Sequence, residues 1–363
     1  MRVKLEDVCE KESSNIKQSE ILNKTGEYPI YGAAGYLGNV DFYHQEKSYV
    51  AVVKDGAGIG RATLCPPKSS VIGTMQYLLP KENVLPEYLC YVVKYMHLEK
   101  YFTGATIPHI YFKVYKNEEF NLHTFNQQIK IVSILRRVEN IIEFRHQELK
   151  KLDGLIKARF VEMFGDVIHN SKSWKVYAFA DIASSRLGKM LDAKQQTGKY
   201  SYPYLANFNV QWFKFNLDNL NRMDFDEADR IEFELRDGDL LVCEGGEIGR
   251  CAVWHNEMQP CFFQKALHRV RCNRQIVHPD YLAWWFKYNC DNNGFAAIAG
   301  AKATIAHLPG AKLKQLRVAV PPLEIQERFA AFVTQTDKSK VAVQKALEET
   351  QLLFDSLMQK YFG

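Results

Sequence analysis

Two long stretches of the chain carry apolar side chains at the spacing of a helix that packs on another helix. Residues 126–164 contain no proline, and their only glycine is Gly154. Steps of three and four residues from Leu135 to Met163 meet an apolar side chain at seven of nine positions, and the same steps from Val333 to Tyr361 meet one at six of nine. This narrow stripe predicts two helices of equal length. The apolar positions that we expect to be buried along the stripe are Leu135, Val138, Ile142, Leu149, Leu152, Ile156, Val333, Val343, Leu347, Phe354 and Leu357.

The two stripes can be buried in more than one way. A narrow seam suits a helical partner, so the simplest arrangement pairs the two helices as an antiparallel coiled coil within one chain. Each helix could instead cover the globular domain next to it, and the helices could also pair between two chains. The pattern favours the first arrangement.

The remaining sequence has the pattern of a mixed globular fold. Short segments rich in β-branched residues, at Tyr49–Lys54, Val71–Leu79 and Asp239–Cys243, are separated by glycine and proline turns and are typical of strands. Leu85–Tyr95 and His278–Tyr288 are typical of short helices with proline in the first turn. We therefore expect an α+β domain in each half of the chain.

The chain contains an internal tandem repeat. The Tyr28-Pro29 pair recurs 174 residues later, Arg61 recurs 189 residues later as Arg250, and Gln128 recurs 198 residues later as Gln326. The offset then stays at 198 from His109 to the end of the first copy. Because loops accept insertions more readily than packed helices, the front of each copy varies in length and the helical part does not.

These patterns together predict an α+β fold in four parts. A first globular domain covers residues 1–124 and a central helical spacer covers residues 125–165. A second globular domain covers residues 166–320 and a distal helical spacer covers residues 321–363. The polar segment 166–173 is the natural connector between the two copies.

Composition and charge exclude few functions. Lys and Arg exceed Asp and Glu by 47 to 42, a net charge of +5, which permits a nucleic-acid partner without requiring one. No run approaches eighteen consecutive apolar residues, and the first residues lack an apolar signal region. The eight cysteines are scattered, with no pair at C-x-x-C spacing. We expect a cytoplasmic protein with reduced thiols, no structural metal and no membrane contact.

Motifs that carry catalytic chemistry are absent from the sequence. There is no G-x-x-x-x-G-K-[ST] loop, no G-x-S-x-G elbow, no H-E-x-x-H and no Asn-Pro-Pro-aromatic tetrapeptide. The glycine-rich segment Gly56–Gly60 departs from a phosphate-binding spacing and is better explained as a tight turn between strands. We therefore expect no catalytic residues, although an enzyme with an unrecognised active site, such as a nuclease or a solitary DNA methyltransferase, is an alternative.

The segments that lead into the two long helices resemble those of a known family. Residues 104–135 and 300–333 follow a pattern of Gly-small-small, an apolar stretch, Pro-Pro-Leu and Glu-x-Gln. The second copy keeps Pro-Pro-Leu-Glu-x-Gln in full, while the first has His123-Thr124-Phe125 and Asn126 in place of Pro-Pro-Leu and Glu but keeps Gln128. Over essentially its whole length the chain resembles the specificity subunit of type I restriction–modification systems.

The resemblance implies a non-catalytic reader of double-stranded DNA. Each globular part would be a target-recognition domain that reads half of a split, asymmetric site. The paired helices would hold the domains apart and dock two DNA adenine methyltransferase (modification) subunits, which restriction and translocase subunits then join. The resemblance implies no cofactor in this chain; S-adenosylmethionine, ATP and Mg²⁺ would be bound by the partner subunits.

Residue chemistry suggests which side chains contact DNA. Lys and Arg suit phosphates, whereas Arg, Lys, Gln and Asn can read base edges through paired hydrogen bonds. Gln76 and Gln264 are the best candidates for base edges, while Arg61 and Arg250 recur in both copies and so favour phosphate anchoring or support of the fold. The full candidate set is Lys54, Arg61, Lys68, Gln76, His109, Arg250, Gln264, Lys265, Lys302, Thr304 and His307.

A helical spacer has the right size to act as a ruler on DNA. About 35 helical residues span roughly 50 Å, and half-sites on one face of B-DNA lie about 34 Å apart. Two recognition domains of moderate affinity on a stiff spacer bind more tightly together and reject sites of wrong spacing.

Two further alternatives for the function of the chain stay open. One is a specificity chain of another restriction system that uses this architecture, and the other is a coiled-coil scaffold without a role on DNA.

Overall fold

The computed structural model describes residues 1–22, 24–104, 108–192, 196–295 and 307–363. The chain divides into two compact units. Unit 1 comprises Met1–Glu148 and Ala342–Gly363, and unit 2 comprises Leu149–Val341. The four-part division inferred from the sequence is finer than this one, and its limits stay predictions.

Unit 1 is built mainly from short strands followed by helices. In chain order its elements are β1 (Arg2–Lys4), α1 (Leu5–Val8), β2 (Cys9–Ser13), η1 (Gln18–Glu20), β3 (Tyr28–Gly32), β4 (Gly35–Val40), β5 (Tyr49–Val53), β6 (Ala62–Cys65), β7 (Ser70–Val71), β8 (Met75–Pro80), α2 (Pro86–Tyr95), η2 (Leu98–Tyr101), α3 (Phe112–Tyr115), β9 (Glu119–Asn121) and the start of α4 (Phe125–Phe164).

Unit 2 follows the same course with additions. Its elements are β10 (Lys175–Ala178), α5 (Phe179–Ile182), β11 (Ala183–Leu187), β12 (Ser201–Leu205), η4 (Asn207–Asn209), β13 (Val210–Gln211), β14 (Lys214–Phe215), β15 (Asn221–Asp224), α6 (Glu227–Phe233), β16 (Leu240–Cys243), β17 (Cys251–Val253), β18 (Phe262–Phe263), β19 (Leu267–Cys272), α7 (Pro279–Asp291), α9 (Gly310–Gln315), β20 (Arg317–Val320) and the start of α10 (Leu323–Phe362).

The sheets of the two units have the same topology. Unit 1 has a four-stranded sheet β2-β8-β5-β6, a three-stranded sheet β4-β3-β7 and the pair β1-β9. Unit 2 has β11-β19-β16-β17, β15-β12-β18 and β10-β20 in the same order, and adds the pair β13-β14. Even the mixed pairing is repeated, because β3 is parallel to β7 and β12 is parallel to β18. The tandem repeat predicted from the sequence is therefore a repeat of the fold.

The added elements explain why the offset between the copies grows. The offset rises from 174 at Tyr28 to 189 at Arg61. In unit 2 this interval holds η4, β13 and β14, which lie between β12 and β15, whereas in unit 1 β3 passes to β4 through a short turn. The insertion lies in a connection between strands, as the sequence predicts for a segment that tolerates changes in length.

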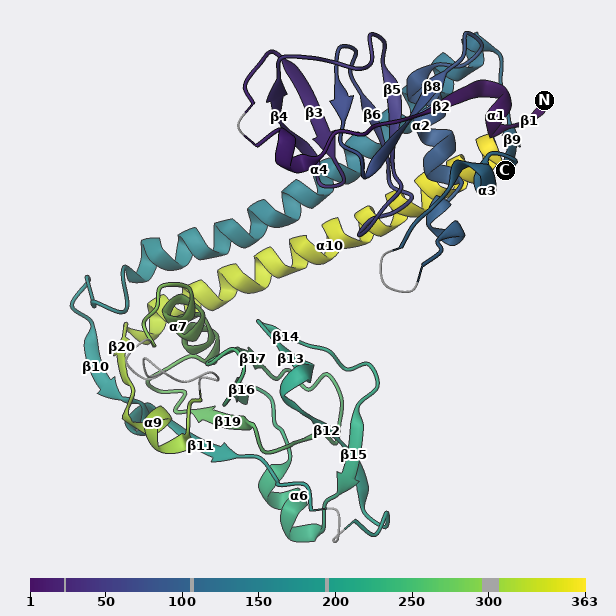
Figure 1. The fold of residues 1–363 in the computed structure, drawn as a ribbon. Coiled ribbons are helices and arrows are strands. Elements are labelled where there is room, and N and C mark those ends of the chain that lie inside the picture. The colour runs from purple at the N-terminus through teal and green to yellow at the C-terminus, as the bar shows by residue number, and fades with distance from the viewer. Residues whose placement is uncertain (23, 105–107, 193–195, 296–306) are drawn as a thin grey trace. The chain divides into compact units, whose positions relative to one another are not determined.

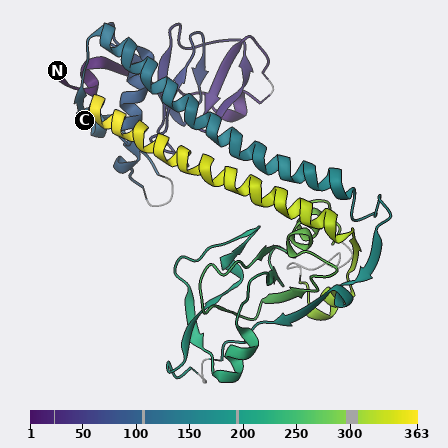
Figure 2. The same ribbon diagram turned by 180° about the vertical axis from the view of Figure 1, so that it is seen from behind.

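The two long helices are α4 and α10, each of 40 residues, or about 60 Å at 1.5 Å per residue. They pair in an antiparallel arrangement, because the start of α4 lies in the same unit as the end of α10 (Figure 1, teal and yellow). The reverse view shows the same pairing (Figure 2). All nine positions of each predicted stripe are buried or half-buried. The predicted seam is confirmed.

The helix ends also cover the domain cores, so the two proposed ways of burying the stripes occur together. In unit 1, Leu135 of α4 and Met358 of α10 share one hydrophobic core with Tyr88 of α2. In unit 2, Phe160 of α4 and Phe329 of α10 share a core with α7, and their ring centroids are 5.5 Å apart.

The short elements predicted from the sequence are largely confirmed. The segment Tyr49–Lys54 forms β5, and Asp239–Cys243 forms β16. The predicted strand Val71–Leu79 is split, because a turn separates β7 from β8. Both short helices begin with proline at the first position, α2 at Pro86 and α7 at Pro279. In the part of the chain that the structure describes, the helices are too short or too polar to span a membrane.

Candidate nucleic-acid interface

A glycine hairpin joins β5 to β6 in unit 1 and β16 to β17 in unit 2. Most glycines of the hairpin have positive φ, with +81° at Gly60 and +79° at the equivalent Gly249. A Cβ on Gly60 would lie 2.5 Å from the backbone nitrogen of Glu99, and one on Gly249 would lie 3.1 Å from the ring of Phe286. These glycines are needed for turn geometry and close packing, which confirms the tight turn predicted between strands.

A second segment runs alongside this hairpin in both units. In unit 1 the amide of Gly56 donates to Pro108, and the amide of Ile110 donates to Lys54. In unit 2 Gly245 forms a β-bridge with His307, and the amide of Leu308 donates to Glu244. The hairpin residue Lys54 and the distant His109, both expected to contact DNA, thus lie together in unit 1, and His307 lies against the equivalent hairpin in unit 2.

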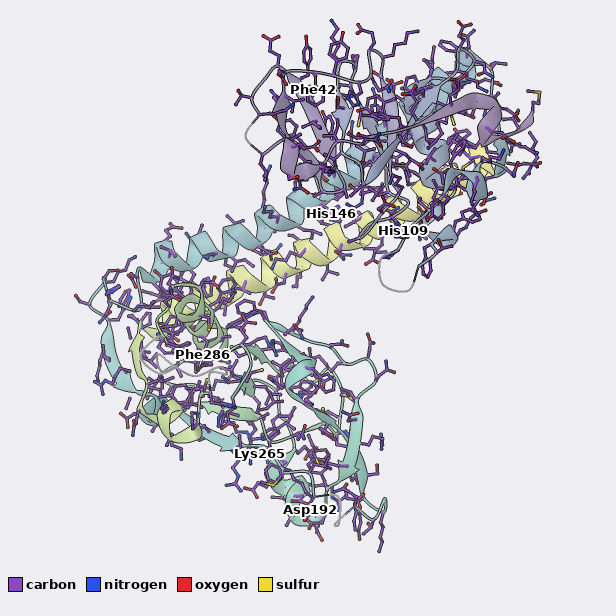
Figure 3. All side chains as sticks on the ribbon, in the orientation of Figure 1. Phe42, His109, His146, Asp192, Lys265 and Phe286 are labelled. Carbon is purple, nitrogen blue, oxygen red and sulfur yellow. The ribbon has the colours of Figure 1, made fainter. Side chains whose placement is uncertain are left out.

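Lys54, Asp55 and His109 form a charged cluster at this place in unit 1. His109 Nδ1 lies 2.7 Å from Asp55 Oδ1, and the Lys54 ammonium pairs with the same carboxylate. Burial raises the pKa of Asp55, but hydrogen bonds from Lys54 and His109 outweigh it and hold that pKa below its ordinary value. The imidazole side chain is 37% exposed (Figure 3), so it is accessible to a ligand while its Nδ1 is engaged.

The two recurring arginines brace the fold in the same way. Arg61 donates from Nη1 to the carbonyl of Ala33 at 3.1 Å, and Arg250 donates from Nη2 to the carbonyl of Asn207 at 3.0 Å. Ala33 and Asn207 are repeat counterparts, because they lie 174 residues apart, the same offset as between Tyr28 and Tyr202. Each lies just beyond the strand that begins with or contains the repeated Tyr-Pro pair. The Arg250 side chain is 18% exposed, whereas Arg61 is exposed. Of the two roles considered from the sequence, this geometry supports bracing at Arg250, and only Arg61 keeps a guanidinium at the surface.

Gln76 was expected to read a base edge, and its position argues against that role. The residue is 1% exposed and its amide donates to the hydroxyl of Tyr115. It faces inward because β8 is a central strand of the four-stranded sheet. The equivalent residue of unit 2, which pairs with Leu241 as Gln76 pairs with Val52, is the buried Arg269. A central strand buried on both faces leaves neither side chain free to meet DNA.

The other candidates lie at or near the surface. Lys68 is exposed at a turn with a φ of +53°, and Lys265 is exposed beside β19 (Figure 3). Gln264 is half-buried and its backbone forms a bridge with Lys189. His307 is exposed. Two candidates, Lys302 and Thr304, lie outside the described residues.

Burial makes the cysteine thiols unreactive. All eight cysteines are free thiols. Burial raises the pKa of Cys9 to about 12 and that of Cys243 to about 11, which keeps both protonated and unreactive at neutral pH. Within the described ranges, no three His, Cys, Asp or Glu side chains are grouped as a metal site would require.

Comparison with known sequences decides the family. The sequence matches the type I restriction modification DNA specificity domain over residues 1–153 and again over residues 171–351. The chain belongs to the type I specificity family. The two matched ranges correspond to the two copies of the tandem repeat, which agrees with the resemblance seen in the sequence.

One relative in the specificity family is the putative type I restriction enzyme MjaX specificity subunit of Methanocaldococcus jannaschii. It is 24% identical over 195 residues, which is 53% of this chain and 46% of the relative. The aligned region therefore spans about half the length of that curated relative.

Solved structures of low sequence identity share the specificity-family fold. The type I restriction–modification S subunit from M. genitalium superposes with a TM-score of 0.63 at 14% identity and covers all of this chain and 96% of its own. A chain described in connection with complex assembly and conformational transition of the type I R-M system gives a TM-score of 0.62 at 15% identity, covering 99% and 97%. These likenesses establish the fold across both units.

Several surface side chains of this specificity-family chain were missed by the sequence analysis. Tyr111 is 51% exposed, stacks on His109 with ring centroids 6.4 Å apart, and lies under the Lys113 ammonium at 5.6 Å. In unit 2, Arg230 lies over the rings of Tyr200 and Tyr202, at 5.9 and 5.7 Å. A basic residue close to an aromatic one, as in Tyr-Phe-Lys at 111–113, was the available signal.

Proposed function

We propose that this chain is a DNA specificity subunit in which each unit reads one half of a split, asymmetric site on double-stranded DNA. The observation that carries the proposal is the repetition of one sheet topology in two units whose added elements differ. A shared framework suits binding to the same double helix twice. The different surfaces suit two unlike half-sites, because sequence is read by side chains at base edges.

The contacts to DNA would come from the hairpin regions. In unit 1 the exposed Arg61 and the Lys54–Asp55–His109 cluster lie on or beside the glycine hairpin, and Tyr111 and Lys113 follow on the same docked segment. Cationic groups at one surface favour a phosphate backbone, and a tyrosine hydroxyl can also donate to a phosphate oxygen. In unit 2, Lys265 and His307 are exposed near the equivalent hairpin.

The long helices would dock the modification subunits. In unit 1 the outer side of α4 exposes Ile134, Ile141 and Phe144, at 39%, 46% and 60%. Apolar residues at spacings of seven and three lie on one side of a helix, and their exposure favours burial by a partner. Two DNA adenine methyltransferase subunits would bind there, and restriction or translocase subunits would join them.

The cofactors would belong to those partners. S-adenosylmethionine would be held by the modification subunits for methylation of adenine at N6, and ATP with Mg²⁺ by the restriction subunits. In this proposal the present chain contributes recognition and assembly, and no catalytic residue.

A methylome tests the proposal. The chain is expressed with the modification subunit encoded beside it in a host that lacks DNA methylation, and N6-methyladenine is mapped by single-molecule sequencing. We expect a split, asymmetric motif that disappears when this chain alone is omitted.

Two results would overturn the proposal. Methylation that is unchanged without this chain would remove its role in specificity. Methylation or cleavage of DNA by the purified chain alone would support the alternative of an enzyme with an unrecognised active site.

A further inference from the structure

A buried glutamine joins the start of α4 to the recognition domain in unit 1. Gln128 is 0% exposed. Its Oε1 accepts a hydrogen bond from the amide of Leu85 at 2.9 Å, directly before α2. Its Nε2 donates to the carbonyls of Asn83 and His123, both at 3.0 Å. One side chain thus connects the loop before α2, the junction segment and the spacer helix.

Gln326 makes the equivalent three bonds in unit 2. It is also 0% exposed, and its Oε1 accepts from the amide of His278 at 2.8 Å, directly before α7. Its Nε2 donates to the carbonyls of Ile276 at 3.0 Å and Pro321 at 2.8 Å. Each partner is the repeat counterpart of a partner of Gln128, at an offset of 193 before the short helix and 198 at the junction.

The sequence around these bonds differs between the units, while the bonds do not. The junction reads His123-Thr124-Phe125 in unit 1 and Pro321-Pro322-Leu323 in unit 2. In unit 1 the position taken by Pro321 is occupied by His123, whose Nδ1 lies 2.8 Å from the Tyr88 hydroxyl. The preserved feature is the amide, which has the acceptor and the two donors that this geometry uses.

A hydroxyl bond reinforces each junction. Tyr88 donates to the carbonyl of Asn121 at 2.8 Å, and the equivalent Tyr281 donates to the carbonyl of Ala319. Both tyrosines are fully buried. The short helix of each unit is therefore attached to the start of its spacer helix through side-chain bonds to backbone groups that have fixed positions.

We propose that Gln128 and Gln326 are positioning residues that fix the register between each recognition domain and its spacer helix, and so restrict the gap between the two half-sites. This inference rests on the proposed function. A slip of one residue along an α-helix rotates it by about 100° and shifts it by about 1.5 Å. A buried amide with three specific partners opposes such a slip, because any slip leaves buried backbone groups without partners.

We call Gln128 and Gln326, with their hydrogen bonds, the Gln clamp. The test compares variants of these two glutamines with matched variants elsewhere on the same helices. Gln128→Met and Gln326→Met keep the length of the side chain and remove its hydrogen bonds. Gln147→Met and Gln344→Met are the controls, because both are exposed and each bonds only a glutamate four residues away on its own helix. Each variant is expressed with the modification subunit, and N6-methyladenine is mapped on a plasmid library in which the gap between the two half-sites varies.

We expect wild type and both controls to methylate a single gap. Gln128→Met and Gln326→Met should also methylate sites whose gap is one base pair longer or shorter, with both half-site sequences unchanged. The preference for the original gap should fall by at least about tenfold, because each variant loses three hydrogen bonds and the loss of one or two is enough for an effect of that size.

Clamp variants that keep a single gap, even at lower efficiency everywhere, would overturn the inference and leave the glutamines a stabilising role only. Should the Met variants fail to fold, as judged by circular dichroism, Gln128→Asn and Gln326→Asn keep an amide at the same place but shorten it, so that it cannot reach all three partners. A single gap in both Asn variants would overturn the inference equally. A wild type that gives no split motif would contradict the proposed function itself, and a wild type that tolerates several gaps would contradict only this inference.

Discussion

The two units share one framework of sheets and junction contacts, and they differ in the connections between strands. Both have the same strand order, the same Gln clamp, the same Tyr–carbonyl bond and the same Arg brace behind the glycine hairpin. Unit 2 adds β13, β14 and the helix α6, whose N-terminus is capped by Asp226. The comparison separates residues that hold the fold from surfaces that are free to diverge, which is what the proposed reading of two unlike half-sites requires.

The units also fill their cores differently. Around the helices, unit 2 uses an aromatic cluster in which Phe160 contacts Phe164, Tyr281 and Phe329 at centroid distances of 4.9 to 6.0 Å. Unit 1 relies on Leu135 and Met358, with Phe362 packed against Tyr88. The same task of attaching a helix pair is thus met by two packing solutions, as expected where volume is conserved rather than identity.

Changing the length of the spacer should have the largest effect. Four residues inserted after the exposed His146 of α4 (Figure 3) lengthen the helix by about 6 Å and introduce a stutter into the heptad. We expect methylation of the original site to be lost and the recognised gap to change by about one or two base pairs, at about 3.4 Å each. Motif selection from a gap library measures this, and recovery of the original gap would show that the helix is not the ruler.

Truncating one core side chain in one unit at a time should lower the free energy of unfolding of that unit and leave that of the other unit unchanged. Phe160→Ala should cost about 3–5 kcal/mol in unit 2, and Leu135→Ala about 2–5 kcal/mol in unit 1, because both side chains are fully buried. All five tryptophans lie between residues 174 and 285, so tryptophan fluorescence reports on unit 2 alone. Phe160→Ala should therefore lower the denaturant concentration at the midpoint of the fluorescence transition. Leu135→Ala should leave that midpoint nearly unchanged and lower mainly the midpoint of the transition measured by circular dichroism.

A fluorescence transition that moves equally in both variants would show that the two units unfold together. Exposed positions on the same helix provide the control. Ala substitution of Leu155, which is 49% exposed, should leave both signals nearly unchanged.

Most of the framework could be predicted from the sequence, because repetition and helical periodicity are visible without coordinates. The stripe from Leu135 to Met163 is buried as its spacing indicates, and the proline starts of α2 and α7 are where the chain places Pro86 and Pro279. The interpretation of Gly56–Gly60 as a turn rested on the glycine spacing and on the conformational freedom of glycine, and it was correct.

The candidate interface was less predictable, because a residue type does not reveal which way a strand faces. Gln76 has suitable chemistry for a base edge but lies in a central strand, where both faces are covered. For Arg250 the sequence left phosphate anchoring and support of the fold open, and the contact with Asn207 favours support of the fold. The role of Gln128 and Gln326 depends on three backbone groups that only the folded chain brings together; in the sequence, their recurrence and their place in the Glu-x-Gln pattern were the signals.

The arginine brace gives a prediction of intermediate size. Arg250→Ala should destabilise unit 2 by about 1–3 kcal/mol, because the carbonyl of the half-buried Asn207 loses its strong donor and keeps only the weak contact of the Cys243 thiol at 3.9 Å. Arg61→Ala, at an exposed position, should cost less than about 1 kcal/mol. Denaturant titrations measure both values, and equal costs would contradict the difference in burial between the two guanidinium groups.

For DNA affinity we expect the opposite order: Arg61→Ala should have the larger effect, although Arg250→Ala has the larger effect on stability. If Arg61 contacts a phosphate, Arg61→Ala should weaken binding to all sequences and reduce the salt dependence of affinity by about one counterion. Arg250→Ala should leave the salt dependence unchanged once folded protein is selected. Binding isotherms at several salt concentrations distinguish the two.

The smallest effect is expected from the charged cluster, and pH reveals it. Hydrogen bonds from Lys54 and His109 hold the pKa of Asp55 below its ordinary value, in spite of burial. A carboxyl whose pKa is depressed by folding adds stability above its unfolded pKa, near 3.9, and loses that contribution as the pH falls through the lower folded value. Asp55→Asn should therefore have a lower melting temperature than wild type at pH 7, and the two melting temperatures should converge as the pH falls from about 5 to about 3.

The matched control is Asp41→Asn, at a carboxyl that is 72% exposed, and its melting temperature should follow that of wild type at every pH. A deficit in Asp55→Asn that stays constant with pH would mean that the carboxylate charge contributes nothing to the stability of unit 1.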